Sequence, residues 1–194
     1  MNQSEIQNTN AEKILDVSWQ LFQQKGYRGV SIDEICLQAG ITKPTLYYYF
    51  HNKEELFARV LEHRLKNFHE AISAAGSLAE RLQNVARTIL ESFESDYSFL
   101  LRDRENLKQP ENLARVRVAF RTELYQPIND LMREGIALGE LADQDAELLT
   151  LAFLGIVNNF IGKSAEKGLK NSDLAQGMVR LFLHGAAVAR ISQQ

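Results

Sequence analysis

The stretch that decides the fold runs from Ser31 to Phe50 and reads SIDEICLQAGITKPTLYYYF. It begins with the pattern of a capping box, because a serine that can accept a bond from a helix amide is followed three residues later by Glu34, which can reach back. Apolar residues then recur at helical spacing, namely Ile32, Ile35, Cys36 and Ala39. Gly40 is the expected end of this helix, which the pattern predicts over residues 31–38.

A second short helix is predicted over residues 42–48, with Thr42 as its N-cap. Pro44 is tolerated in its first turn, where backbone amides have no helical partner. Two short helices joined by a tight turn are typical of a helix-turn-helix, whose second helix brings its N-terminal residues to the base edges of DNA. Lys43 can reach guanine acceptors or a phosphate, and Thr45 can bond a base or touch a thymine methyl. We expect base-edge contacts from Thr42, Lys43, Pro44 and Thr45.

Three consecutive tyrosines, Tyr47, Tyr48 and Tyr49, lie between the apolar pair Leu46 and Phe50. The spacing of that pair predicts that it fills the small core, which leaves the tyrosines near the outside. Their phenol groups can donate to phosphate oxygens. Lys53 follows at the start of the next helix, where a cation and free amides together favour an anion. The alternative is that the tyrosines only pack.

The rest of the chain shows helical periodicity broken by turn signals, and nothing alternates with the period of a strand, so we predict an all-α fold. We divide it into a DNA-binding domain at residues 1–51 and a helical effector-binding and dimerisation domain at residues 52–194. A kink is expected at Pro127. The other expected helices cover about residues 11–25, 52–75, 78–93, 98–107, 111–138, 143–167 and 172–191.

Composition limits the function classes without indicating DNA binding. The net charge of the 194 residues is −3, and the first 75 hold eight Lys and Arg against nine Asp and Glu, so the motif alone carries the DNA-binding hypothesis. No apolar run approaches the roughly 20 residues that span a bilayer, and we expect a cytoplasmic protein. The single cysteine, Cys36, is expected to be a buried thiol rather than a redox sensor. His63 and His69 are six residues apart on different helix faces, so neither a metal nor a cofactor is expected.

From Ala11 to Glu62 the chain resembles the DNA-binding domain of the tetracycline-repressor (TetR) family. The residues that carry the resemblance are Ile14-Leu15, Leu21-Phe22, Gly26-Tyr27, Ser31-Ile32, Ile35, residues 39–43 (AGITK), Leu46-Tyr47, Phe50 and residues 53–56 (KEEL). The resemblance implies that Ser31, Tyr47 to Tyr49 and Lys53 touch phosphates, and that Lys43, Pro44, Thr45 and Tyr48 lie nearest the base edges. Ser18 and Trp19 depart from the family pattern, and beyond residue 75 only the general layout matches.

Two helices near the C-terminus are apolar on two sides, and a helix of this kind must bury both sides. One side would lie in the core of its own protomer and the other against a second copy, which is also what the resemblance implies. We therefore predict a homodimer in which each protomer contributes two helices. The expected interface residues are Leu151, Gly155, Leu174, Met178, Leu181, Gly185 and Ala189.

The region between the motif and these helices is rich in aromatic residues, which indicate either ordinary core or a pocket for a partly apolar effector. The expected pocket residues are Phe68, Phe93, Tyr97, Phe120 and the polar Asn159. In the family, a ligand in this region moves the two DNA-binding domains apart and releases DNA. We therefore expect a ligand-responsive repressor on a palindromic double-stranded operator, with no role at a membrane. The alternatives are a protein–protein adaptor or an enzyme that keeps this fold.

Overall fold

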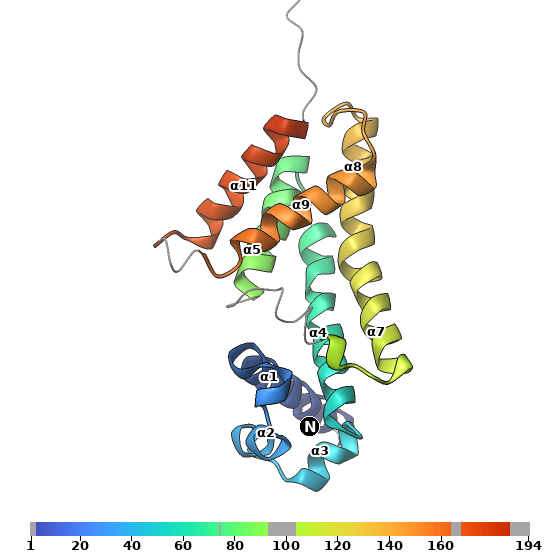
Figure 1. Cartoon of the computed structure of the whole chain (residues 1–194), viewed down its shortest axis with the longest axis vertical. Helices are drawn as coiled ribbons and strands as arrows, with labels where there is room; N and C mark the ends of the chain where they lie inside the picture. Colours follow the sequence, from blue (N-terminus) through green and yellow to red (C-terminus); the bar gives the residue numbers. More distant parts are fainter. Residues whose placement is uncertain (1–2, 74, 93–103, 164–167, 187–194) are drawn as a thin grey trace, which may run out of the picture. The chain divides into compact units, whose positions relative to one another are not determined.

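The computed structural model describes residues 3–73, 75–92, 104–163 and 168–186, and within those ranges it holds helices and no strand (Figure 1). The all-α prediction is confirmed. None of the described helices is long and apolar enough to cross a membrane. The elements are α1 (Gln3–Gly29), α2 (Ile32–Ala39), α3 (Lys43–Tyr49), α4 (Lys53–Ser73), α5 (Leu78–Ser92), the 3₁₀ turn η1 (Arg104–Asn106), α7 (Pro110–Phe120), the π-helical turn η2 (Arg121–Tyr125), α8 (Gln126–Ala137), α9 (Ala146–Phe160) and α11 (Asn171–Ala186).

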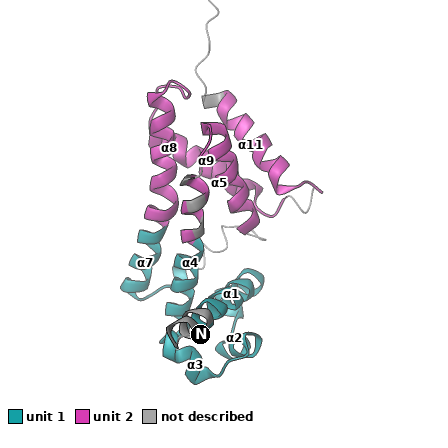
Figure 2. Cartoon of the chain, turned by 180° about the vertical axis from the view of Figure 1, so that it is seen from behind, with its two compact units in different colours: residues 1–64, 97–119 teal, residues 65–96, 120–194 magenta. Residues whose placement is uncertain are grey.

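The chain forms two compact units, which Figure 2 shows in different colours. The first unit holds residues 1–64 and 97–119, and the second holds residues 65–96 and 120–194. This division falls inside α4, because the first half of that helix and α7 belong to the same compact unit as the helix-turn-helix. The predicted boundary between residues 51 and 52 separates the DNA-binding function from effector binding and dimerisation. It does not coincide with the boundary between the packed units, and it stays a prediction.

The first unit is built around a core of apolar side chains from α1, α2, α3 and the start of α4. Phe22 and Phe57 are fully buried, and their ring centroids lie 5.0 Å apart in an edge-to-face arrangement that aromatic pairs favour. The helical part of α1 ends at Gly26, whose positive φ of 73° is the left-handed conformation that glycine adopts most readily. The expected end of this helix is confirmed, while its start lies further upstream than predicted.

In the second unit α11 packs on α5 and α9, and α9 packs on α8. Phe153 of α9 meets Phe182 of α11, with ring centroids 5.5 Å apart. One polar pair lies in this core: Asn129 Nδ2 donates to Thr150 Oγ1 over 3.3 Å, and Thr150 in turn donates to the carbonyl of Ala146 over 2.7 Å. Because each of these polar groups has a partner, the pair can be buried without a large desolvation cost.

The expected kink near Pro127 takes the form of a π-helical turn just before it. Proline has no amide hydrogen, so the carbonyl one turn earlier loses its usual donor. The backbone shifts register there: the Gln126 amide donates to the carbonyl of Arg121, five residues back, and α8 then begins with Pro127 in its first turn. Another boundary differs from prediction, because Asp145 caps α9 and the helix begins at Ala146. Of the expected helix 98–107, residues 98–103 lie outside the described residues and residues 104–106 form η1.

Candidate nucleic-acid interface

In α2, the first helix of the motif, one of the two hydrogen bonds of the predicted capping box forms. Ser31 Oγ accepts a bond from the Glu34 amide over 3.1 Å, as a capping box requires. The Glu34 carboxylate does not return this bond and forms an ion pair with Lys25 of α1. Gly40 ends the helix with φ 65° and ψ 38°, the left-handed conformation expected of it. Cys36 is buried, as predicted, and burial raises the pKa of its thiol.

The second helix, α3, begins after Thr42 as predicted and ends at Tyr49, one residue later than predicted. Thr42 Oγ1 accepts a bond from the Thr45 amide over 3.4 Å and lies 2.9 Å from the Thr45 hydroxyl. Pro44 occupies the first turn. Leu46 and Phe50 are buried in the first unit, so the predicted pair does fill the core. The position of α3 is therefore set from within, and its other side chains are left to face outward.

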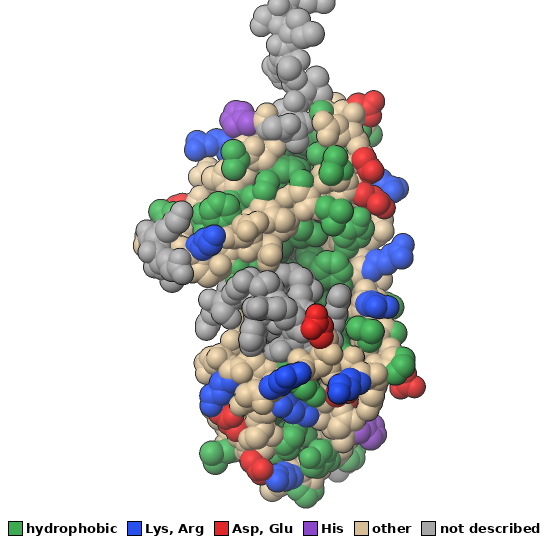
Figure 3. Space-filling model, viewed as in Figure 1, with side chains coloured by type: hydrophobic (Ala, Val, Ile, Leu, Met, Phe, Trp, Pro, Cys, Tyr) green, Lys and Arg blue, Asp and Glu red, His purple; other side chains and the backbone are tan. Residues whose placement is uncertain are grey.

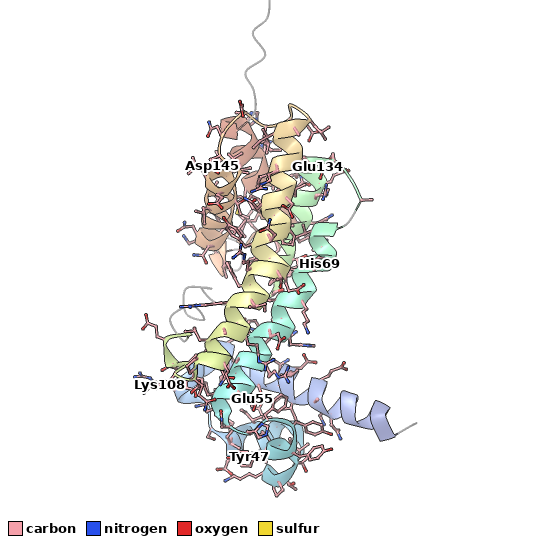
Figure 4. All side chains as sticks on the ribbon, turned by 90° about the vertical axis from the view of Figure 1, so that its right-hand side faces the viewer. Tyr47, Glu55, His69, Lys108, Glu134 and Asp145 are labelled. Atoms are coloured by element: carbon pink, nitrogen blue, oxygen red, sulfur yellow. The ribbon has the colours of Figure 1, made fainter. Side chains whose placement is uncertain are left out.

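The exposed face of α3 carries the residues that we expect to contact DNA. Thr42, Lys43 and Pro44 are exposed, and Thr45 is half-buried. Tyr48 is 70% exposed and Tyr47 is 45% exposed, and Figure 4 shows Tyr47 on the outer side of the helix-turn-helix. Tyr49 is half-buried, with its ring 5.1 Å from that of Tyr48 in an edge-to-face contact. A face with hydroxyls, phenols and a cation has the donors that phosphates and bases accept.

Just after α3, the start of α4 adds a further cation. Asn52 Oδ1 accepts a bond from the Glu55 amide over 2.8 Å and caps this helix. Lys53 lies with Nζ 4.5 Å from the ring centroid of Tyr27, a cation–π contact that holds the ammonium group near the helix N-terminus. Glu55 accepts two bonds from His51, from the backbone amide over 3.0 Å and at Nδ1 over 2.7 Å.

An ion pair that the sequence pattern did not predict joins the two motif helices. Asp33 lies in the first turn of α2, and its Oδ1 is 2.8 Å from Nζ of Lys43, the first residue of α3. The hydrogen bond to Asp33, and then its negative charge, raise the pKa of Lys43. The residues are on different helices, so helical spacing could not have indicated the pair.

A second missed feature joins α4 to α7 within the first unit. Glu54 Oε1 accepts three bonds: from the Lys108 amide over 3.0 Å, from the Gln109 amide over 2.7 Å and from the buried Asn112 side chain over 3.2 Å. Figure 4 labels Lys108 near the start of α4, where Glu55 lies. A carboxylate at this place satisfies amides at the start of α7 that have no helical partner. Glu54 thus caps a helix more than 50 residues further along the chain.

The expected interface residues lie on two different sides of their helices. Leu151 and Gly155 of α9 are exposed, and Figure 3 shows hydrophobic side chains gathered over α9. On α11, Leu181 is 64% exposed, but Leu174 and Met178 are only 8% and 3% exposed. The prediction for these last two residues is corrected, because α11 turns them toward α5 and α9 in the protomer's own core. Gly185 lies within α11 where side chains are not described, and Ala189 lies outside the described residues.

The expected effector residues differ in their burial. Phe68 is buried in the second unit, and Phe120 is half-buried at the end of α7. Asn159 is exposed, and its Nδ2 donates to the carbonyl of Gly155 over 2.9 Å. It shares the outward face of α9 and bonds its own helix, and its role in effector binding stays a prediction. Phe93 and Tyr97 lie outside the described residues.

Known proteins are similar to this chain over both units. Residues 14–60 match the family of bacterial regulatory proteins called the tetR family, and residues 75–186 match the tetracyclin repressor-like C-terminal domain. The HTH-type transcriptional regulator YdgC of Bacillus subtilis is 22% identical over 179 residues, which cover 90% of this chain and 91% of that protein.

Solved structures of two regulators share the fold. FadR from Bacillus subtilis, solved with stearoyl-CoA, has a TM-score of 0.70 and 19% identity, covering 90% of this chain and 98% of that one. AibR, solved with isovaleryl coenzyme A and operator DNA, has a TM-score of 0.70 and 22% identity, covering 89% of this chain and 97% of that one. The two family matches together span well over half of the sequence and include the exposed face of α3. The chain therefore belongs to the TetR family of bacterial regulatory proteins, and it is a DNA-binding transcriptional regulator.

Proposed function

We propose that this regulator is a repressor that binds a palindromic operator as a homodimer and leaves it when a small-molecule effector binds the second unit. The observation that carries the proposal is how α3 is held in place. Thr42 caps its start, and the buried side chains of Leu46 and Phe50 set its orientation. A rigidly held helix with polar residues on its outer face is suited to reading base edges.

We assign roles to the DNA-facing residues by what each group can donate. Lys43 and Thr45 donate to base edges, while Pro44 and Tyr48 make flat contacts beside them. Phosphate contacts come from the remaining hydroxyl, phenol and ammonium groups, namely Ser31, Tyr47, Tyr49 and Lys53, while Thr42 stays with the base-edge residues. Ser31 and Tyr47 are exposed, which supports their assignment, whereas Tyr49 and Lys53 are half-buried.

The homodimer is supported by the exposed leucines of the second unit. Leu148, Leu151 and Leu181 are each more than half exposed on α9 and α11. Burying apolar surface of this kind against a second copy contributes roughly 25 cal/mol for each Å² removed from water. Two-fold symmetry then presents two copies of α3 to inverted half-sites about 34–36 Å apart or a multiple of that distance.

For the effector we propose a thioester of coenzyme A with an apolar acyl chain. FadR and AibR, which share this fold, were each solved with such a compound. Phe120, at the end of α7, is half-buried and offers apolar surface to an acyl chain, whereas Phe68 of α4 is buried. The effector must bind the DNA-free protein more tightly than the DNA-bound protein by the same factor by which it weakens operator binding.

The test begins with selection of operator fragments from genomic DNA, followed by titration of a labelled operator with stearoyl-CoA, isovaleryl-CoA or free coenzyme A. We expect one acyl thioester to weaken operator binding by about 5- to 150-fold, the usual range of such coupling, and free coenzyme A to have a smaller effect. Thr45→Ala should change base preference at one position in each half-site, whereas Lys53→Ala should weaken binding to all sequences alike. A protein that selects no duplex would instead act as the adaptor that keeps this fold.

A further inference from the structure

The ion pair between α2 and α3 places an acidic group directly beside the face of α3 that we expect to read DNA. The Asp33 side chain is 75% exposed and that of Lys43 is 51% exposed, with 2.8 Å between Oδ1 and Nζ. Surface pairs of this kind contribute little to folding, because water screens the charges and two flexible side chains must be ordered. We therefore expect this pair to affect DNA binding more than the free energy of unfolding.

Lys43 belongs to a wider pattern in which the cations of the motif are matched internally. Between residues 25 and 64 the chain has six Lys and Arg, and each has a protein partner. The partners are Glu34 for Lys25, Asn106 for Arg28, Asp33 for Lys43, the Tyr27 ring for Lys53, Glu62 for Arg59 and Asp16 for Arg64. Non-specific DNA binding comes almost entirely from unmatched cations that displace counterions from phosphates. Four of these six cations face a carboxylate, so residues 25–64 carry little uncompensated positive charge for binding without sequence preference.

We infer that Asp33 is a specificity-determining residue, which positions the Lys43 ammonium group for a base edge and makes its use on an arbitrary phosphate costly. The inference rests on the proposed function, in which the face of α3 reads DNA. An ammonium group has three donors, so Lys43 can keep its bond to Asp33 and still donate to a guanine acceptor. A move of Lys43 to a phosphate leaves the Asp33 carboxylate unpaired beside the polyanion, and like charges repel.

Asp33 should therefore weaken binding mainly at DNA sites that lack the matching base. At the operator the pair is retained and the negative charge remains compensated. At other sequences, a phosphate outside the reach of the paired ammonium group can be bound only if Lys43 leaves Asp33, and otherwise Lys43 contributes no contact. Asp33 should accordingly lower non-specific affinity more than it lowers operator affinity.

The test compares wild type with Asp33→Asn, which keeps the size of the side chain and removes its charge. Affinity is measured by fluorescence anisotropy on a selected operator and on a shuffled duplex of equal composition, over a series of KCl concentrations. We expect roughly three- to tenfold tighter binding to the shuffled duplex, a smaller change on the operator, and a salt slope steeper by about 0.9 for one added phosphate contact. Asp33→Glu, which restores the charge, should restore most of the discrimination.

Two controls test whether Asp33 acts by positioning Lys43 or only by repelling the phosphates of DNA. Glu140→Gln removes one negative charge from an exposed site at the end of α8, in the other unit, and should leave both the salt slope and the specificity ratio unchanged. In a Lys43→Ala background, Asp33→Asn should alter the shuffled-duplex affinity less than it does in wild type, because the effect passes through Lys43. An Asp33→Ser variant serves as a second neutral substitution, and thermal melting by circular dichroism checks that each variant folds.

The outcomes distinguish this inference from the proposed function. If wild type binds the operator with clear preference but Asp33→Asn matches Glu140→Gln in salt slope and specificity, the inference is overturned. An equal gain of Asp33→Asn with and without Lys43 also overturns it, since simple repulsion then explains the effect. If wild type shows no preference for any duplex, the proposed function itself is wrong.

Discussion

The outward faces of α3 and α9 are exposed for different physical reasons. The face of α3 carries hydroxyls, phenols and a lysine paired with Asp33, so water can solvate it well. The face of α9 carries Leu148 and Leu151, which water solvates poorly. A polar face gains most from a charged, hydrogen-bonding partner, and an apolar face gains most by leaving water. We therefore expect the first to meet DNA and the second to meet another copy of the chain.

The largest effect should come from emptying the core beneath α3. Leu46→Ala leaves a cavity at a fully buried position and should lower the free energy of unfolding by about 2–5 kcal/mol. Operator binding should be lost, because the orientation of α3 depends on this side chain. Urea unfolding and anisotropy measure the two effects. Leu37→Ala, at an exposed leucine of neighbouring α2, is the matched control and should change stability by less than about 0.5 kcal/mol.

The next largest effect concerns the apolar face of the second unit. Leu151→Glu places a charge at an exposed position of α9, where burial against a partner without compensation would cost several kcal/mol. We expect monomers in sedimentation velocity and loss of cooperative binding to a two-half-site operator, with unchanged helix content. Leu138→Glu, at an exposed leucine just after α8, is the control and should stay dimeric. A dimeric Leu151→Glu protein would place the interface elsewhere and remove the contrast between α9 and α3.

A smaller effect should follow from weakening the cap that Glu54 provides for α7. Glu54→Gln keeps an oxygen acceptor but removes the negative charge that accepts three hydrogen bonds. A hydrogen bond to a charged group contributes at most about 1.5–3 kcal/mol to the free energy of unfolding. We expect a loss of about 1–2 kcal/mol in stability, and faster hydrogen exchange at the Lys108 and Gln109 amides. Glu111→Gln, in the first turn of α7, is the control for charge alone. Unchanged exchange at those two amides in Glu54→Gln would contradict the capping role.

The smallest expected effect is the pH dependence that Glu55 contributes. Although burial acts to raise its pKa, the hydrogen bonds from the His51 side chain and backbone hold the pKa of Glu55 below its usual value of 4.5. A lowered folded-state pKa adds stability above the unfolded value, and this is lost as the pH falls through the folded value. Glu55→Gln should therefore be less stable than wild type at pH 7, by under about 1 kcal/mol, with a smaller difference near pH 3. Urea unfolding at both pH values measures this, and a difference that grows on acidification would contradict the assignment.

The features that the sequence predicted well are local ones. Ser31, Thr42 and Asn52 each cap a helix through a bond to an amide three residues on, so residue type and spacing indicate the contact directly. Gly40 ends α2 for a reason that lies in its own backbone, since it lacks a Cβ atom. Burial of Leu46 and Phe50 followed from helical periodicity, because only one face of so short a helix can meet the core.

Only the tertiary structure determined which side chains on different helices contact one another. Helix α11 is apolar on two sides, and packing against α5 and α9 determined that Leu174 and Met178 are buried while Leu181 is exposed. The bonds of Glu54 to the start of α7 and of Asp33 to Lys43 join residues on different helices, which no helical period relates. Sequence spacing thus determined the caps, turns and inner face of the helix-turn-helix, whereas these longer contacts depend on how separate helices pack.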